Sequence, residues 1–188
     1  MQNLLETVIE ELEAVVKDTG NAFWNIPPAT AALLQWLIKV HKPSRVLEIG
    51  TSNGYSALRM AQVLSHSGGV LYTVESHAER FATAEKNFAR AGVEGLVHQV
   101  KGHAPEILSS LEGVFDMVFL DATKMEYQSY VDFLYPKLSI GAIVVADNCV
   151  SHGDDLYMQK FLQFMKETPL FSSVLLSFDN GVLLAHKS

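Results

Sequence analysis

Short apolar runs alternate with amphipathic segments along most of the chain, and this alternation limits the folds that it can adopt. Runs such as "MVFL" and "AIVVA" are apolar at every position, which is typical of strands that are buried on both faces of a parallel sheet. We therefore predict an α/β fold with a mostly parallel sheet and helices on both of its faces. The predicted strands span 45–49, 70–74, 96–100, 115–120 and 142–146, and the predicted helices that follow them span 54–65, 77–91, 104–111, 125–138 and 154–167.

The C-terminal segment departs from this alternation. The sequence "SVLLSFDNGVLLAHK" contains two strand-like runs joined by Asp179, Asn180 and Gly181. An Asn-Gly pair between two apolar runs is a strong signal for a β-hairpin. We predict that the last two strands are antiparallel neighbours, which gives a seven-stranded, mostly parallel sheet that ends in an antiparallel hairpin.

Two further helices are predicted before the first strand. Residues 4–16 carry an apolar stripe with acidic residues on the opposite side, which indicates an amphipathic helix. This stripe could dock onto its own domain or onto the second subunit of a homodimer, and the sequence leaves both arrangements open. Another helix is predicted over 29–40, because Pro27 and Pro28 favour a helix start and Pro43 ends the helical pattern.

Length and composition limit the class of protein. The 188 residues, without a Pro/Gly/Ser-rich linker, predict a single domain, 1–188, in which N-terminal helices (1–41) precede a core (45–188). No apolar run approaches the roughly 18 residues of a membrane span and the N-terminus is acidic, so we expect a cytoplasmic protein without a membrane segment. A net charge of −7 argues against a nucleic-acid partner. A single cysteine, Cys149, excludes an intrachain disulfide and a multi-cysteine metal site.

The turn after the first predicted strand, within "VLEIGTSNGYSALRM", combines an acidic residue with two glycines. Glu48 lies near the strand end, where burying a carboxylate is costly unless something requires it. Gly50 and Gly54 would let a ligand approach the backbone, although an ordinary strand-to-helix turn explains them equally well, and their spacing is not that of a dinucleotide motif. Glu75 ends the second strand, where an acidic side chain can accept both hydroxyls of a ribose. Together these residues favour a nucleoside site without a phosphate clamp.

Polar residues also follow the fourth and fifth predicted strands. Asp121 follows "VFL", and Asp147 and Asn148 follow "IVVA". If the two strands are neighbours, about 4.8 Å apart, these side chains converge at the edge where ligands bind in open α/β sheets. Two carboxylates and an amide are hard oxygen ligands, which favour Mg²⁺ or Ca²⁺ over zinc. A helix cap at Asp121 and a simple turn at Asp147-Asn148 would explain the same residues without a metal.

Five segments of the chain together resemble a known family. From Ile26 to the C-terminus, the sequence is similar to the cation-dependent O-methyltransferases that use S-adenosylmethionine, the group that contains catechol O-methyltransferase and caffeoyl-CoA O-methyltransferase. The resemblance implies a Rossmann-like class I methyltransferase fold. It also implies transfer of a methyl group to a hydroxyl of a catechol-like or vicinal-diol small molecule. The segments that carry it are "NIPPATAALL", "LEIGTSNGYSALRMA", "VES", "VFLDATK" and "VVADN".

The resemblance implies a binding site for S-adenosylmethionine. Glu48, Gly50 and Ser56 would surround the methionine part of this cofactor, and Glu75 would bind its ribose. Glu48 would then be a ligand-facing acid beside a cationic cofactor. The complete implied cofactor site comprises Glu48, Gly50, Ser52, Gly54, Tyr55, Ser56, Glu75, Ser76, Gly102, His103, Ala104 and Asp121.

The resemblance further implies a metal site and a general base. Asp121, Asp147 and Asn148 would hold Mg²⁺ or another divalent cation such as Ca²⁺ or Mn²⁺, and Asp121 would also take part in catalysis. Lys124 matches the position of the family's general base. A lysine is normally protonated at neutral pH, but a nearby divalent cation favours the neutral amine. Without the family match, an exposed lysine at a helix start would be the simpler interpretation of Lys124.

Four other residues each have a functional and a structural interpretation. His103 lies beside the expected adenine site, where many bacterial relatives carry an acidic residue, so its contact with adenine stays open. Trp24 either flanks the acceptor pocket, as in relatives, or packs in the core. For Cys149 we favour a small buried residue, and for His152 a solvent-facing loop residue.

Two differences from the family narrow the acceptor. Only "CVSHGDD" separates Asn148 from the next helix, whereas the plant caffeoyl-CoA enzymes have a longer loop and a longer N-terminal arm, so a CoA ester is disfavoured. The final hairpin carries Val182, Leu183 and Leu184 where catechol O-methyltransferase has a carboxylate, so the sequence does not establish catechol as the acceptor.

Three functions remain in competition at this point. The first is metal-dependent methylation of a small molecule with vicinal hydroxyls. The second is methylation of a hydroxylated tRNA base, which some bacterial relatives perform and which the acidic net charge and the lack of a basic stripe disfavour. The third is a non-catalytic protein that binds S-adenosylmethionine, which the complete metal set and Lys124 disfavour.

Overall fold

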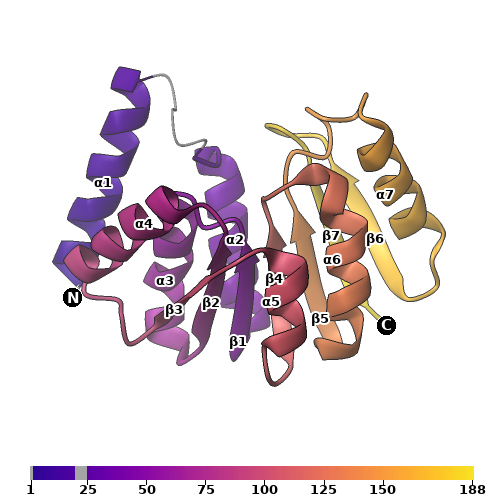
Figure 1. Cartoon of the computed structure of the whole chain (residues 1–188), viewed down its shortest axis with the longest axis horizontal. Coiled ribbons are helices and arrows are strands. Elements are labelled where there is room, and N and C mark those ends of the chain that lie inside the picture. Colours follow the sequence, from indigo (N-terminus) through magenta and orange to yellow (C-terminus); the bar gives the residue numbers. More distant parts are fainter. Residues whose placement is uncertain (1, 20–24) are drawn as a thin grey trace.

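The computed structural model describes residues 2–19 and 25–188. These residues form one seven-stranded sheet with helices on both faces (Figure 1). The strand order is β3-β2-β1-β4-β5-β7-β6, in which β7 runs antiparallel to both of its neighbours. The predicted α/β fold with a C-terminal antiparallel hairpin is therefore confirmed. The strands are β1 (Arg45–Ile49), β2 (Val70–Glu75), β3 (Val97–Lys101), β4 (Phe115–Leu120), β5 (Leu138–Ala146), β6 (Phe171–Leu176) and β7 (Val182–Lys187).

The helices begin and end within a few residues of the predicted bounds, with one exception. None of the described helices is both long enough and apolar enough to cross a membrane. The α-helices are α1 (Gln2–Thr19), α2 (Pro28–His41), α3 (Tyr55–Ser67), α4 (Ala78–Ala91), α5 (Ala104–Ser110), α6 (Tyr127–Leu134) and α7 (Leu156–Glu167), and the 3-10 helices are η1 (Lys124–Glu126) and η2 (Tyr135–Lys137).

The exception is the helix predicted over 125–138, which is wrong in length. The α-helix α6 ends at Leu134, and the 3-10 helices η1 and η2 flank it. Pro136 lies in η2. Proline has no N–H for an α-helical hydrogen bond and its ring clashes with the preceding turn, so the α-helix cannot continue through it. Strand β5 consequently begins at Leu138, four residues before the predicted start at 142.

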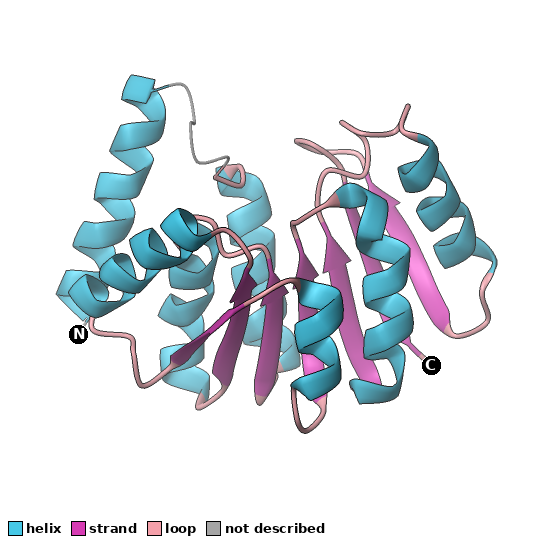
Figure 2. Ribbon diagram, viewed as in Figure 1, coloured by secondary structure: helices cyan, strands magenta, loops and turns pink. Residues whose placement is uncertain are grey.

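Different helices cover the two faces of the sheet (Figure 2). Helices α1 to α4 pack on one face, and α5 to α7 pack on the other. Side chains of β1 alternate between the two cores, since Val46 lies in the first and both Leu47 and Ile49 lie in the second. Because β1, β2, β4 and β5 are parallel, their carboxyl ends meet at one edge of the sheet, where the turns that follow them can build a single site.

The N-terminal helix α1 docks onto its own chain. Glu13 Oε1 accepts hydrogen bonds from the hydroxyl of Tyr55 (2.7 Å) and from the guanidinium of Arg59 (3.2 Å), both on α3. Of the two arrangements that the sequence leaves open, the structure shows docking within the chain. The buried residues of the α1 stripe are Leu5, Val8 and Ile9.

Gly50 brings the turn after β1 against the end of β4. Its φ is +108°, and an added Cβ would lie 2.1 Å from the backbone oxygen of Asp121. A glycine is therefore required here both by the backbone conformation and by the close approach of two chain segments. This approach places the first turn of the sheet directly beside a predicted metal ligand.

We expect Gly50→Ala to destabilise the fold more than Gly92→Ala. Both positions have a positive φ, where a side chain costs about 1 to 2 kcal/mol, but a Cβ at Gly92 would meet no atom within 4 Å. At Gly50 the β1 turn must also move away from β4, so we expect a loss of at least about 3 kcal/mol in the free energy of unfolding. Denaturant unfolding of the two variants measures the difference. Equal losses would contradict the argument that the contact with Asp121 requires glycine.

Candidate active site

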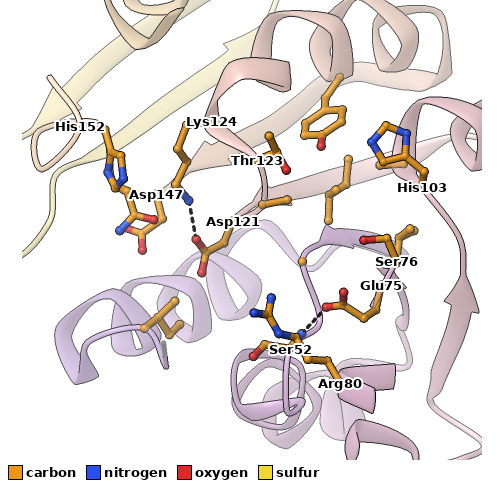
Figure 3. Close-up of a pocket in the computed structure, with 18 of the residues that line it drawn as sticks. Ser52, Glu75, Ser76, Arg80, His103, Asp121, Thr123, Lys124, Asp147 and His152 are labelled. Atoms are coloured by element: carbon orange, nitrogen blue, oxygen red, sulfur yellow. Dashed lines mark hydrogen bonds and ion pairs between the residues drawn. The ribbon is translucent and has the colours of Figure 1, made fainter. Parts of the chain in front are cut away.

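A cavity of about 540 Å³ lies at the carboxyl edge of the sheet, among the turns that follow its parallel strands (Figure 3). All of the residues predicted to bind metal or to act in catalysis line it, together with most of the implied cofactor residues. The fold thus brings together side chains that are far apart in the sequence. The predicted residues in the lining are Gly50, Ser52, Glu75, Ser76, Gly102, His103, Ala104, Asp121, Lys124, Asp147 and Asn148.

Glu75 lies on one side of this cavity, at the end of β2 (Figure 3). Its Oε2 accepts a hydrogen bond from the backbone N–H of Ser52 (2.9 Å), and its Oε1 accepts one from the backbone N–H of His77 (2.8 Å). These two bonds hold the carboxylate plane in place while each oxygen keeps a further lone pair. The geometry suits an acid that accepts two neighbouring hydroxyls of a ligand.

Glu48 lies behind the cavity wall and does not line it. It stands opposite Thr73 in the β1–β2 pair, and its Oε2 accepts a hydrogen bond from the Thr73 hydroxyl (2.5 Å). Its Oε1 accepts one from the hydroxyl of Ser56 (2.5 Å). Burial, which outweighs these two hydrogen bonds, raises the pKa of Glu48 to about 8. The structure thus departs from the expected ligand-facing carboxylate, because the pleat of β1 directs this side chain toward α3.

Three more residues of the implied cofactor site lie outside the lining of the cavity. Gly54 precedes α3 and packs against Phe88, where an added Cβ would lie 2.7 Å from the ring. Tyr55 turns away toward α1, as its hydrogen bond to Glu13 shows. Ser56 is engaged with Glu48. These residues shape the turn from behind, whereas Gly50 and Ser52 face the cavity.

Asp121 and Asp147 bring two carboxylates to the opposite side of the cavity from Glu75 (Figure 3). Asp147 is only 1% exposed, and its buried Oδ1 has no hydrogen-bond partner among the described residues. Burial, followed by the negative charge of Asp121, raises the pKa of Asp147 to about 6. A carboxylate pair of this kind is stabilised by a cation or by a proton.

The donor set around Asp147 fits a hard divalent cation. Asn148 directly follows Asp147, with a φ of +62°, and lines the same cavity. Two carboxylates and one amide oxygen match the ligands that Mg²⁺ prefers. The buried Oδ1 of Asp147, which has no hydrogen-bond partner among the described residues, could coordinate such an ion. Across residues 2–19 and 25–188, no three His, Cys, Asp or Glu side chains form a metal-binding group.

Lys124 begins η1 and lies against the first of these carboxylates (Figure 3). Its Nζ donates hydrogen bonds to Oδ1 of Asp121 (2.8 Å) and to the hydroxyl of Tyr127 (2.9 Å). The side chain is 15% exposed and forms part of the cavity wall. The lysine that the resemblance implies as the base is thus held by two partners at the same end of the cavity as Asp147.

His103 lies at the other end of the cavity, together with two residues that the sequence analysis did not select. His103 Nε2 lies 3.1 Å from Oε1 of Glu126, and the hydroxyl of Tyr130 donates to Oε2 of the same carboxylate (2.5 Å). Both His103 and Tyr130 line the cavity. Since Lys124 and Glu126 belong to the same short helix η1, this element contributes to both ends of the site. A contact between His103 and adenine stays a prediction.

Several residues of the lining were not predicted as site residues. Arg80 lies in the first turn of α4, where the helix dipole disfavours a cation, and this unusual placement is a signal that could have identified it. Asn25 and Thr123 belong to the segments "NIPPATAALL" and "VFLDATK", so the resemblance points to their segments without assigning them a role. The polar lining residues that were not predicted are Asn25, Arg80, Thr123, Tyr130 and Asn180.

The remaining candidates have mixed outcomes. Cys149 is 1% exposed and its thiol lies 3.4 Å from the carbonyl oxygen of Ala146, which confirms the interpretation as a small buried residue. His152 is exposed as predicted, but it also borders the cavity near Asp147 (Figure 3), so it is more than a solvent-facing loop residue. Trp24 lies outside the described residues.

The β6–β7 turn adds a carboxylate that the sequence analysis did not place at this edge. Asp179 is one of the charges that raise the pKa of Asp147, after burial and the charge of Asp121. Its Oδ2 accepts a hydrogen bond from the hydroxyl of Thr30 (3.4 Å). Val182 and Leu183 therefore do not describe what the hairpin contributes to this edge, because both side chains are buried in the cores.

Comparisons with known proteins agree with this geometry. A family model described as O-methyltransferase matches residues 2–188. The O-methyltransferase ankF of Aspergillus thermomutatus is 30% identical over 184 residues, which cover 84% of this chain and 76% of that protein. The catechol O-methyltransferase of Niastella koreensis is 35% identical over 140 residues, which cover 72% of this chain and 63% of that protein. The chain thus spans less than two thirds of the length of this second relative.

Solved structures extend the similarity to the fold. The crystal structure of an O-methyltransferase from Bacillus cereus in complex with SAH superposes with a TM-score of 0.87 at 25% sequence identity. The superposition covers 97% of this chain and 91% of that one. The similarity therefore extends over the sheet and its C-terminal hairpin.

Glu48 generates a prediction about the pH dependence of stability. In the unfolded chain this carboxyl has its ordinary pKa of 4.5, whereas in the folded chain its pKa is about 8. Between these two values the folded state holds a proton that the unfolded state has released. The stability that Glu48 contributes is therefore fully present below about pH 4.5 and is lost as the pH rises toward 8, by at most about 1.4 kcal/mol per pH unit.

We expect Glu48→Gln to flatten this pH dependence, because the amide has the shape of the protonated carboxyl and does not ionise. Urea unfolding across the same pH window, for the wild-type protein and for both Glu48→Gln and Glu79→Gln, measures the slope. Glu79 is exposed in the first turn of α4 and serves as the control. Parallel slopes for all three proteins would show that Glu48 is not protonated in the folded state.

Proposed function

The chain belongs to the O-methyltransferase family, and from this we propose that it transfers a methyl group from S-adenosylmethionine to a hydroxyl of a small molecule with vicinal hydroxyls. One observation carries the proposal. A single cavity is lined at one end by Glu75, and at the other by Asp121, Asp147 and Lys124. A nucleoside cofactor and a chelated acceptor could therefore meet within it.

We assign the end of the cavity near Glu75 to the cofactor. The fixed carboxylate of Glu75 would accept the two ribose hydroxyls, and Gly50 and Ser52 would let the methionine part approach the β1 turn. Glu48 would act indirectly, through the hydroxyls of Ser56 and Thr73. The relatives and the SAH complex of the Bacillus cereus enzyme support this cofactor.

We assign the other end of the cavity to a divalent cation and the acceptor. Asp121, Asp147 and Asn148 would hold Mg²⁺, or another hard cation such as Ca²⁺ or Mn²⁺, and the unpartnered Oδ1 of Asp147 supports this assignment. When bound, such an ion supplies orientation of two vicinal oxygens and a lower pKa for the hydroxyl that is methylated. CoA esters and catechol itself are not singled out by any residue of the lining.

The proposed reaction needs one proton acceptor, and we assign this role to Lys124. As the neutral amine, its Nζ would take the proton of the acceptor hydroxyl. The acceptor oxygen would then form a C–O bond to the methyl carbon, and the C–S bond would break with its electron pair remaining on sulfur. The products would be a methyl ether and S-adenosylhomocysteine. Most of the rate enhancement then comes from holding the two reactants in line.

The experiment that tests the function is a methyl-transfer screen. Catechols, flavonoids and hydroxylated nucleosides are offered with labelled S-adenosylmethionine, with and without Mg²⁺. We expect transfer to acceptors with vicinal hydroxyls in the presence of Mg²⁺. Transfer to the nucleosides alone would favour methylation of a tRNA base, which the net charge of −7 disfavours. Cofactor binding without any transfer would favour a non-catalytic protein.

We expect Glu75→Ala to weaken the binding of S-adenosylmethionine by about 1.5 to 3 kcal/mol, or about 10- to 150-fold, because charge-assisted hydrogen bonds to the ribose are lost. Titration calorimetry without metal measures the affinity. Glu79→Ala, an exposed acid a few residues away, is the control and should bind normally. An unchanged affinity of the Glu75 variant would remove the ribose assignment.

We expect Asp147→Ala to leave cofactor affinity nearly intact and to lower methyl transfer at least about 100-fold, because the acceptor loses both its orientation and its lowered pKa. Chelation of divalent cations should have the same effect on the wild-type protein. Asp132→Ala, an exposed acid on α6, is the matched control. Full activity in both the chelated protein and the Asp147 variant would place the chain with methyltransferases that need no cation.

A further inference from the structure

Tyr127 is the first residue of α6 and lies under the end of the cavity that contains Lys124. Its side chain is fully buried and does not line the cavity. The sequence gives no reason to select it, since an aromatic residue at the start of an amphipathic helix is usually part of a core. Its hydroxyl, however, is engaged with the machinery of the site.

The hydroxyl of Tyr127 makes three polar contacts. It accepts a hydrogen bond from Nζ of Lys124 (2.9 Å). Its own proton faces two backbone carbonyl oxygens, that of Leu120 at 2.9 Å and that of Asp147 at 3.2 Å. Leu120 is the last residue of β4, and Asp147 directly follows β5. One buried oxygen atom therefore connects the lysine to the ends of the two strands that carry the predicted metal ligands.

These contacts define the direction of the Lys124 amine. Nζ carries three positions besides its bond to Cε, and two of them point to Asp121 Oδ1 (2.8 Å) and to the Tyr127 hydroxyl (2.9 Å). Because the nitrogen is tetrahedral, these two bonds fix the direction of the third position. A flexible lysine side chain without the second bond would rotate about the bond to Asp121.

The ring of Tyr127 is held independently of its hydroxyl. It packs edge-on against Phe161 of α7, with ring centroids 5.5 Å apart, and it also contacts the ring of Tyr130. A phenylalanine at this position would keep these ring contacts and lose only the hydroxyl. The carbonyl of Leu120 would still accept a hydrogen bond from the backbone N–H of Asp147 (3.0 Å). The substitution therefore isolates the polar contacts.

We propose that Tyr127 is a positioning residue for methyl transfer. Its hydroxyl directs Nζ of Lys124 toward the acceptor and fixes this nitrogen relative to the ends of β4 and β5. The proposal rests on the proposed function, since it assumes that Lys124 is the base. Tyr127 itself touches neither acceptor nor cofactor. Its effect on the reaction passes through Lys124, and this distinguishes it from a tyrosine that merely joins two strands.

A double-mutant cycle tests the proposal with Tyr127→Phe, Lys124→Ala and the double variant. We expect Tyr127→Phe to lower kcat about tenfold, the scale for a misaligned reacting group, while KM and calorimetric affinity for S-adenosylmethionine stay within about twofold. In the Lys124→Ala background the same substitution should change kcat less than about twofold, because the residue through which it acts is already gone. An equal loss in both backgrounds, or a parallel loss of cofactor affinity, would overturn the proposal in favour of a general structural role.

A second measurement uses the protein without cofactor, metal or acceptor. The rate at which an amine-reactive ester labels Lys124 is followed by mass spectrometry, with exposed Lys86 on α4 as the internal reference. Nζ loses one of two partners in Tyr127→Phe, so we expect Lys124 to be labelled at least about threefold faster, with no change at Lys86. Unchanged labelling of Lys124 would overturn the proposal. The melting temperature should fall by no more than about 2 to 4 °C, which confirms that the variant is folded.

The two experiments separate this proposal from the proposed function. Absence of methyl transfer by the wild-type protein in the acceptor screen would overturn the proposed function. The labelling rate would still decide whether the Tyr127 hydroxyl holds Lys124.

Discussion

Compensation of negative charge at one edge of the sheet is the constraint on which the rest of the site depends. The negative charge of each acid at this edge is stabilised or removed in a different way. Glu48 is buried between two hydroxyls with a pKa raised to about 8, so it is mainly protonated at neutral pH. Glu75 accepts hydrogen bonds from two backbone N–H groups, and Asp121 pairs with Lys124. Asp147 keeps a buried oxygen without a partner among the described residues. In the cavity lining the carboxylates of Glu75, Asp121 and Asp147 outnumber the cations of Arg80 and Lys124, and this balance favours a cationic ligand.

The sheet and the composition of its ligand edge could be predicted, because they follow from local patterns. Apolar runs at the predicted strands, and acids placed directly after them, are sufficient once the strands are assumed to be parallel. The direction of individual side chains could not be predicted. Glu48 faces Thr73 because of strand register, and Tyr55 faces Glu13 because α1 docks on α3, and neither relation is encoded within a short window. Pro136 is a signal in the sequence that the α-helix ends, but the helical periodicity of the segment favours a longer helix.

The segment from Asp121 to Tyr130 shows how one short stretch serves both ends of the site. Its 3-10 helix carries Lys124 beside Asp121 at one end and Glu126 beside His103 at the other. A regular α-helix from Asp121 onward would turn these side chains differently, since a 3-10 helix has three residues per turn. The position of η1 therefore sets both the location of Lys124 and that of the carboxylate that contacts His103.

The position of β7 has a consequence for how the site is assembled. This strand, the last in the chain, lies between β5 and β6 and pairs with β5 from Ile143 to Ala146. Strand β5 therefore has an open edge until β7 pairs with it. Asp147 follows β5 directly, so the strand that carries the acidic end of the cavity is covered only by a contact between residues about forty positions apart. The Glu75 end is carried by β2, whose neighbours β1 and β3 both precede β5 in the sequence, so the two ends of the cavity depend on pairings of different range.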